Sequence, residues 1–237
     1  MRLLCGMETL TRKKELSFLE NIFVKSATIL AVRCWETGDF YELDLHLPQA
    51  KPENWTAAQR IATRISNFHY CDYTPARWDV DTKTCTLFID GSHPGRGSQW
   101  LRTLQAGSEL YYASIDSVRH SPIPGTTPVF IGDHTAIGHF SALQQLAGNH
   151  TNTTGFMMVN KPAHKEMVAE NYSWLNLHTI CRHEDYFTQL DNYLEELPTG
   201  TDYVFYLAGN SKLVGNTRKF LRQLGIENGS IKAQGFW

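Results

Sequence analysis

The residue pattern changes near residue 122, and this change divides the chain into two halves that favour different folds. Before it, short segments are rich in β-branched and aromatic residues, several alternate apolar with polar residues, and Gly, Pro and Asp clusters bound them. Strands at this spacing are typical of a small antiparallel barrel or sandwich. We expect strands over residues 27–34, 41–47, 64–70, 84–90 and 109–113, and either a short helix or an edge strand over residues 13–24.

A Pro/Gly linker at residues 121–127 leads into the second half, where short apolar runs alternate with segments of helical spacing. This alternation implies a parallel sheet with helical crossovers. The expected strands are 128–131, 155–159, 203–207 and 231–236, and the expected helices are 135–147, 184–197 and 211–224. The predicted organisation is an N-terminal tail at 1–15, an antiparallel β-barrel domain at 16–122 and an α/β domain at 123–237.

Composition removes several classes of function. A formal net charge of −2 offers no basic field for nucleic-acid phosphates. No run of about 18 apolar residues predicts a membrane span, and no secretory signal is visible, so we expect a cytoplasmic protein without stable membrane insertion. The five cysteines are scattered without a CxxC pair, and the ten histidines form no metal motif. We therefore expect reduced thiols and no metal site. We also expect no hydrolase, because the sequence has no G-x-S-x-G elbow and its spacing indicates no pair of catalytic carboxylates.

Two strand-to-helix turns in the second half are candidate ligand sites. The first is residues 132–136 (GDHTA), and the second is residues 208–211 (AGNS). Ligands of open α/β sheets bind beyond the carboxyl ends of the strands, where free N–H groups at a helix start favour an anion. In the alternative interpretation, Asp133 and Ser211 only cap their helices. Neither turn carries a GxGxxG or Walker motif.

Two segments of the first half could also contact a ligand. Residues 71–75 (CDYTP) follow an apolar strand, and the ring and hydroxyl of Tyr73 and Thr74 suit a planar ligand, although a barrel tyrosine is more often a core residue. Residues 95–100 (GRGSQW) form a Gly-rich turn that enters a short helix. Such turns let backbone N–H groups approach a pyrophosphate, and the alternative is a plain loop with a capping serine.

Taken in order, these segments resemble the siderophore-interacting protein family, a branch of the ferredoxin-reductase-like flavoproteins. Residues 72–79 (DYTPARWD) resemble its R-x-Y-T flavin motif, and residues 95–100 resemble its second FAD segment. Residues 131–136 (IGDHTA) resemble the G-D-E-[ST]-A turn that opens its nicotinamide domain. Residues 206–209 (YLAG) and the final GFW resemble its A-G-E turn and closing G-Y-W. The resemblance runs from about residue 20 to the C-terminus.

The resemblance implies a ferredoxin-reductase-like fold, FAD bound by the barrel, NADH or NADPH as hydride donor and a ferric siderophore as electron acceptor. Reduction would release the metal because hard oxygen ligands prefer Fe(III) to Fe(II). Thr135 would lie near the flavin–nicotinamide contact, and Trp237 would close over the flavin. The cofactor-binding residues carried over are Tyr73, Thr74, His93, Arg96, Gly97, Ser98, Asp133, Ala208, Gly209 and Asn210. Lys219, Arg222 and Lys232 are the candidate siderophore-binding cations.

The chain departs from the family pattern at the first motif arginine, which pairs with the FAD pyrophosphate and is Cys71 here. A thiol cannot make bidentate, charge-assisted hydrogen bonds. Either Arg96 replaces the missing charge and FAD binds normally, or the chain binds flavin weakly and serves as a non-catalytic siderophore-binding module. A general flavin or ferric reductase, or a partner of ferredoxin, is the alternative among enzymes.

Overall fold

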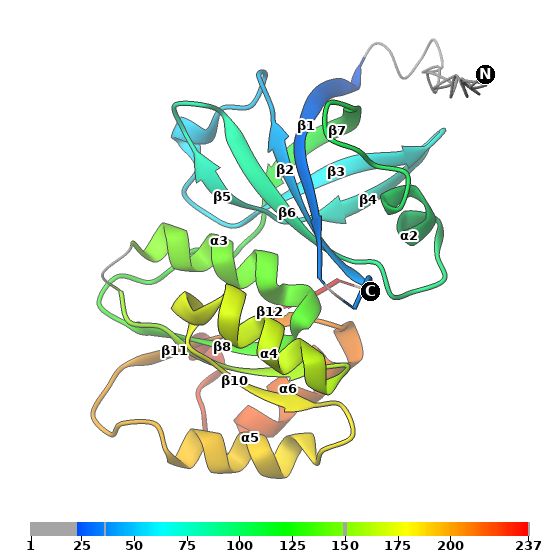
Figure 1. Cartoon of the computed structure of the whole chain (residues 1–237). Coiled ribbons are helices and arrows are strands. Elements are labelled where there is room, and N and C mark those ends of the chain that lie inside the picture. The colour runs from blue at the N-terminus through cyan, green and yellow to red at the C-terminus, as the bar shows by residue number, and fades with distance from the viewer. Residues whose placement is uncertain (1–22, 36, 149–150, 237) are drawn as a thin grey trace, which may run out of the picture.

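A computed structural model describes residues 23–35, 37–148 and 151–236 of the chain. Figure 1 shows two lobes, with the N-terminal half of the chain above and the C-terminal half below. The upper lobe is built on an antiparallel sheet and the lower lobe on a separate parallel sheet. This arrangement confirms the fold class predicted from the sequence. The expected N-terminal tail at 1–15 lies outside the described residues, as does most of the segment 13–24.

Seven strands form the upper sheet, in the order β4-β3-β7-β1-β2-β6-β5. Alternate residues of these strands point into a shared apolar core, in which Leu43, Leu45 and Leu87 are fully buried. A short helix, α2 (Arg96–Leu101), follows β6. The strands are β1 (Lys25–Cys34), β2 (Phe40–His46), β3 (Gln59–Ser66), β4 (His69–Tyr73), β5 (Pro75–Asp79), β6 (Thr84–Asp90) and β7 (Glu109–Ser117).

The lower sheet has the order β10-β9-β8-β11-β12, and all its pairings are parallel. After β8, the strands β9 and β10 are added on one side of it. The chain then returns to β8 and adds β11 and β12 on the other side. In sheets of this kind, ligands bind at the carboxyl ends of the two strands where the order reverses. The elements are β8 (Thr127–Asp133), α3 (Ile137–Ala147), β9 (Thr154–Val159), α4 (Pro162–Asn171), β10 (Leu177–Cys181), α5 (Tyr186–Glu195), β11 (Tyr203–Gly209), α6 (Ser211–Gln223) and β12 (Ile231–Gly235).

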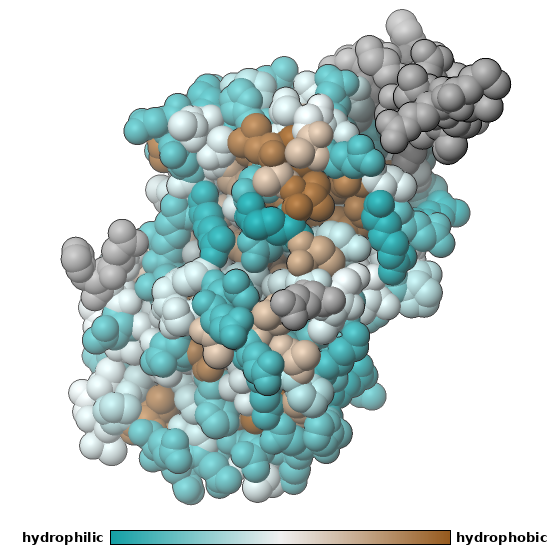
Figure 2. Space-filling view, in the orientation of Figure 1, coloured by the Kyte–Doolittle hydropathy of each residue, from teal (hydrophilic) through white to brown (hydrophobic). Residues whose placement is uncertain are grey.

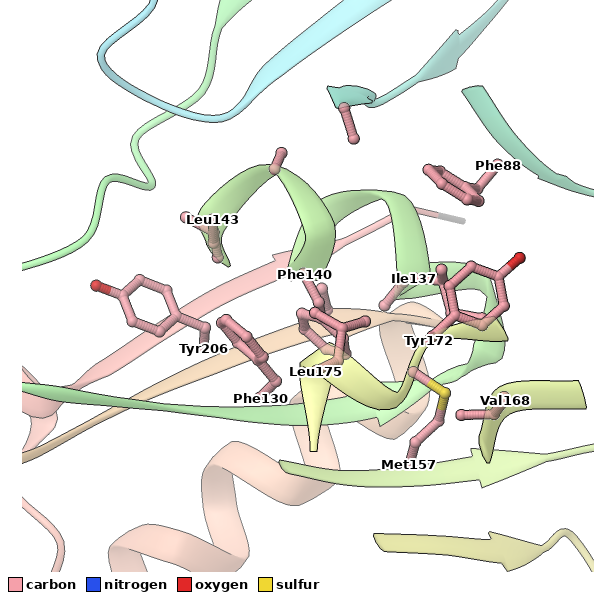
Figure 3. Close-up of a cluster of buried hydrophobic side chains, with 14 of the residues drawn as sticks. Phe88, Phe130, Ile137, Phe140, Leu143, Met157, Val168, Tyr172, Leu175 and Tyr206 are labelled. Carbon is pink, nitrogen blue, oxygen red and sulfur yellow. The ribbon is translucent and has the colours of Figure 1, made fainter. Parts of the chain in front are cut away.

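Helices cover both faces of the lower sheet. Helices α3 and α4 lie between the sheet and the upper lobe, and α5 and α6 lie on the opposite face (Figure 1). The core above the sheet continues into the upper lobe, because Phe88 of β6 packs with Ile137, Phe140 and Tyr172 (Figure 3). Both lobes therefore share buried apolar surface, which fixes their relative position.

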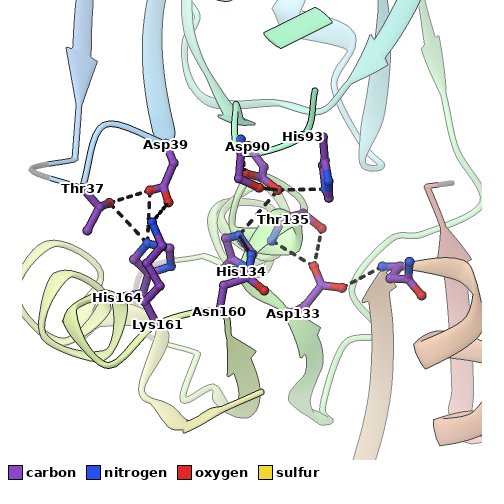
Figure 4. Close-up of polar contacts among 12 residues, drawn as sticks. Thr37, Asp39, Asp90, His93, Asp133, His134, Thr135, Asn160, Lys161 and His164 are labelled. Carbon is purple, nitrogen blue, oxygen red and sulfur yellow. Dashed lines mark hydrogen bonds and ion pairs between the residues drawn. The ribbon is translucent and has the colours of Figure 1, made fainter. Parts of the chain in front are cut away.

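Polar contacts also join the lobes. The Tyr172 hydroxyl donates to Glu42 of β2 and accepts a hydrogen bond from Trp35 Nε1 at 3.2 Å. Asp39, at the start of β2, accepts hydrogen bonds from Lys161 at 2.6 Å and contacts His164 at 3.1 Å (Figure 4). Burial opposes the charge of the Asp39 carboxylate, but these partners lower its pKa.

The sequence located most elements and missed four. Residues 64–70 were expected to form one strand, which is wrong: the chain reverses after β3, where Phe68 adopts φ 54°, and β4 pairs back on β3. Strand β5 was missed because it is short and begins with proline. Helix α4 buries only His164 and Val168, so it shows little apolar periodicity, and β10 follows it.

Figure 2 shows one face of the molecule, on which hydrophobic side chains gather mainly over the upper lobe while the lower lobe is largely hydrophilic. Leu30 of β1, with 49% of its surface exposed, is one of the large apolar residues that the upper lobe presents to solvent. Among the described residues, no helix has the length and apolar character that crossing a membrane requires.

Candidate functional site

A cavity of about 620 Å³ lies between the two lobes, and we call it the inter-lobe cavity. Its upper wall comes from β4 and the end of β6, and its lower wall comes from the start of α3 and the end of β12. This size and a largely apolar lining with a few polar groups are typical of sites for small molecules or cofactors. The lining residues are Tyr70, Cys71, Asp72, Tyr73, Thr74, Phe88, Ile89, Asp90, His93, Thr135, Gly138, His139 and Phe236.

Tyr73 and Thr74 lie at the end of β4 and both line this cavity. The Tyr73 ring stacks on Trp100 of α2, with ring centroids 6.3 Å apart and planes 10° apart. Burial raises the pKa of the Tyr73 hydroxyl far above its ordinary value, so the group stays neutral. Gly97 approaches so closely that a Cβ there would lie 3.3 Å from the Tyr73 hydroxyl and 3.8 Å from Cys71 Sγ. The Gly-rich turn and the Tyr-Thr pair expected to act together are therefore adjacent.

A second cavity, of about 280 Å³, lies over the carboxyl ends of the parallel strands, and we call it the sheet-edge cavity. It shares Asp90, His93 and Thr135 with the inter-lobe cavity, so the two spaces adjoin. Its remaining lining residues come from the ends of β8, β9 and β10 and from the start of α6. They are Asp133, His134, Met158, Asn160, Arg182, Asn210, Lys212, Leu213 and Asn216.

Asp133 joins the two expected turns at the point where the strand order reverses. Its side chain accepts hydrogen bonds from the backbone N–H of Thr135 at 3.0 Å and of Asn210 at 2.8 Å, and also from the Thr135 hydroxyl. Asp133 therefore caps the 3-10 turn His134–Ala136, as the capping interpretation expected. The cap of α6 is Asn210, not Ser211, because the Asn210 side chain accepts from the N–H groups of Lys212 and Leu213.

Close backbone packing explains two glycines of these turns. A Cβ at Gly132 would overlap the carbonyl oxygen of Ala208 on the neighbouring strand. Gly209 has φ +118°, and a Cβ there would lie 2.7 Å from the Asp133 carboxylate. Ala208 and Gly209 thus shape the edge of the sheet through their backbone, and neither lines the two cavities.

Asp90 stands at the junction of the two cavities with 5% of its side chain exposed. It accepts hydrogen bonds from the N–H and hydroxyl of Ser92 at 2.9 and 3.0 Å. His93 Nε2 lies 3.2 Å away and His134 Nε2 lies 3.7 Å away (Figure 4). Burial alone would raise the pKa of Asp90, but the contacts with His134 and Ser92 lower it to about 2. A buried carboxylate is therefore held ionised at this point.

Two buried histidines form a pair at the inter-lobe cavity, which His139 lines. His120 Nδ1 and His139 Nε2 are 2.9 Å apart, and both residues are at most 5% exposed. Burial lowers the pKa of His120 to about 4 and of His139 to about 3, so the pair is neutral near pH 7. Among the residues that the structure describes, no group of three or more His, Cys, Asp or Glu could hold a metal ion.

Most of the residues singled out from the sequence lie at or beside the two cavities, but the expected cations do not. Lys219 and Arg222 line a separate surface hollow on α6, and Lys232 lies on β12 without lining either cavity. Arg77, from the flavin-like motif, lies at the lobe interface with its guanidinium 4.4 Å from the Trp174 ring centroid. Trp237 lies outside the described residues, and the neighbouring Phe236 lines the inter-lobe cavity.

Sequence reasoning did not find three residues of this region. Asp90 follows an apolar strand and precedes Gly-Ser, so it looks like an ordinary turn residue. Arg182 and Lys212 follow β10 and β11, which are separated by two other strands in the sheet. A search for basic residues after each predicted strand could have found Lys212, but β10 itself was not predicted.

The comparisons with known proteins agree with this architecture. Residues 126–237 match the model of the family described as "Siderophore-interacting protein". A siderophore-interacting protein from Acinetobacter baumannii superposes with a TM-score of 0.72 at 14% identity, covering 90% of both chains. A siderophore utilization protein from T. fusca gives 0.66 at 17% identity, covering 90% of this chain and 92% of the other. The ferredoxin reductase of a carbazole 1,9a-dioxygenase gives 0.72 at 17% identity, covering 90% and 69%.

The fold is therefore that of the ferredoxin-reductase-like proteins. Within this class, the α/β lobe matches the model of the siderophore-interacting protein family, and similar solved structures include proteins named as siderophore-interacting or siderophore utilization proteins. The family resemblance that the sequence motifs indicated is confirmed. The comparison with curated proteins found no match.

Proposed function

We propose that this protein is an FAD-dependent reductase that passes electrons from NAD(P)H to a ferric siderophore, with residues 16–122 as the flavin-binding domain and residues 123–237 as the nucleotide-binding domain. The observation that carries this proposal is the meeting of the two cavities at Thr135. One cavity is walled by the Tyr73-Thr74 pair, and the other lies where the order of a parallel sheet reverses. A planar cofactor in the first would face a nucleotide in the second.

The inter-lobe cavity fits the ring system of a flavin. Tyr73, Phe88, Ile89 and Phe236 supply apolar surface, and Thr74 supplies a hydroxyl and backbone groups. Gly138 lets the start of α3 approach this wall, because a Cβ there would lie 3.3 Å from the Thr74 carbonyl oxygen and from the Phe88 ring. This apolar surface would suit the dimethylbenzene end of the isoalloxazine, and the groups of Thr74 would suit its polar pyrimidine edge.

The pyrophosphate of FAD would lie along the Gly-rich turn. Gly97 has no side chain to block it, and the donors would be the Ser98 hydroxyl and the N–H groups of residues 96–98, since the N–H groups of Gly95 and Gln99 already donate to backbone carbonyls. Arg96 is the basic residue within this turn, and its guanidinium donates to His69 Nε2 at 2.5 Å. We propose that Arg96 supplies the charge that the family motif places at position 71, because Gly97 packs directly against Cys71.

The sheet-edge cavity suits a dinucleotide. Arg182 and Lys212 bring two positive charges to its wall, and both are exposed. Asn160 and Asn210 add polar edges. Cations and the start of a helix favour phosphate groups. Thr135 would lie at the reacting end, where its hydroxyl is oriented by the hydrogen bond to Asp133.

A bound flavin would supply the redox chemistry, because it accepts two electrons as a hydride and can return them one at a time. The balance is one NAD(P)H and two Fe(III) giving NAD(P)⁺, two Fe(II) and one proton. The protein's own residues bind and orient the reactants. They also limit access of water to the reacting atoms, because Phe88, Ile89 and Gly138 close the inner wall of the cavity.

A visible spectrum of the purified protein, with and without added FAD, tests the proposal directly. Anaerobic NADH and then NADPH should bleach the flavin bands, and a ferric siderophore should restore them. A flavoprotein reoxidised by ferredoxin or dyes and not by ferric siderophores would favour the general reductase. Cys71 favours the non-catalytic module, and a protein that stays colourless with excess FAD would establish that alternative.

A further inference from the structure

The side chains with a permanent charge that line the inter-lobe cavity are all negative among the described residues. Among the described residues that line it, Asp72 and Asp90 are acidic and none is lysine or arginine. Asp72 is 52% exposed and pairs with Arg60 at 3.3 Å, so water and a counter-ion reduce its field. Asp90 is 5% exposed and contacts only hydroxyl, amide and imidazole groups in the described part of the chain. The cavity therefore faces one strong, weakly screened negative charge.

The imidazoles beside Asp90 are not permanent counter-ions, because a histidine carries a positive charge only when it is protonated. His93 is 59% exposed, so solvent screens any charge that it carries. His134 is 4% exposed, and its Nδ1 is buried without a hydrogen-bond partner in the described structure, so no second acceptor helps to hold a proton on this ring. Buried charges act over longer distances than exposed ones because little water lies between them and their surroundings.

A flavin gains negative charge when it takes up a hydride near neutral pH, so a nearby buried anion disfavours the reduced form. We propose that Asp90 sets a low reduction potential for the flavin of this protein, which makes it a strong donor to ferric chelates. This inference rests on the function proposed above. Asp90 lines both cavities, so its charge acts at the place where the flavin and the nucleotide would meet. The same charge favours the positively charged oxidised nicotinamide.

The test compares the midpoint potential of the FAD-loaded protein with that of Asp90→Asn, by equilibration with a reference dye at pH 8, above the ordinary titration range of histidine. The asparagine is isosteric and keeps an acceptor for Ser92. We expect the reduced-to-oxidised ratio at a fixed poise to rise at least tenfold, which is about 30 mV for a two-electron couple. Asp72→Asn is the matched control, and its shift should be clearly smaller because Asp72 is exposed and paired.

A potential that is unchanged or lower in Asp90→Asn, with FAD bound and a normal spectrum, overturns the inference and leaves the reductase function intact. Equal shifts in the two variants also overturn it. Failure of the unmodified protein to take up FAD overturns the proposed function, and the inference with it. If Asp90→Asn does not fold, Asp90→Ser takes its place, because it is neutral and retains a hydroxyl for the loop.

Discussion

The carboxylate of Asp133 accepts the backbone N–H of Asn210 at 2.8 Å, across the point where the parallel sheet changes direction. This bond ties the turn after β8 to the turn after β11, although the two residues are 77 positions apart in sequence. The same carboxylate holds the N–H and hydroxyl of Thr135. The candidate site thus depends on one buried acid that organises the backbone on both sides of the strand reversal.

Replacing Asp133 by alanine should destabilise the lower lobe. The change leaves the N–H groups of Thr135 and Asn210 without their acceptor in a position that is 5% exposed. Loss of hydrogen bonds to a buried charged acceptor costs roughly 2–4 kcal/mol. Urea unfolding measures this loss, and Asp133→Asn should recover part of it because one amide oxygen remains. Equal stability of Asp133→Ala and the unmodified protein would contradict the assigned role.

Gly97→Ala should weaken FAD binding by about tenfold. The added Cβ would lie 3.3 Å from the Tyr73 hydroxyl, in the space where the Gly-rich turn meets the cavity wall. Overpacking of this kind costs about 1–3 kcal/mol, and about 1.4 kcal/mol corresponds to a factor of ten in Kd. Fluorescence titration with FAD measures the change. Gly95→Ala is the control, because a Cβ there meets nothing within 4 Å, and equal affinities in the two variants would refute the prediction.

The apolar pattern of the sequence predicted the strands and helices whose side chains are buried, and it missed the elements that bury few side chains. Strand β6 matches its prediction at both ends because it is almost wholly buried. The β3–β4 turn was invisible because Phe68, and no glycine, occupies its left-handed position. Of the site, the turns and the Tyr-Thr pair could be read from motifs. Arg182 and Lys212 could not be assigned together, because only the strand order of the lower sheet brings them to one edge, and Asp90 joins them from β6 of the upper lobe through the packing of the two lobes.

Stability should fall as the pH drops below about 6.5, through the buried pair His120 and His139. Burial lowers the pKa of these groups to about 4 and about 3, whereas in the unfolded chain they titrate near 6.5. Between these values the unfolded state binds more protons, so the free energy of unfolding decreases by about 1.4 kcal/mol per pH unit for each proton. Urea unfolding from pH 7.5 to 5 measures this slope. His139→Gln should reduce it, and an unchanged slope would contradict the assignment.

Arg182→Ala and Lys212→Ala should each raise the KM for the nucleotide several-fold while changing kcat little. Both cations line the sheet-edge cavity away from its junction with the inter-lobe cavity, so they would contact the phosphates and not the reacting ring. An exposed charge contact of this kind is worth roughly 1 kcal/mol. Arg218→Ala is the matched control, because Arg218 lies on the same helix as Lys212 but donates to Asn228 at 2.7 Å, outside the cavity. Steady-state kinetics at low salt separates the outcomes: a KM that rises as much in the control as in Lys212→Ala would place the nucleotide elsewhere. A fall in kcat without a change in KM would place these cations beside the reacting ring instead.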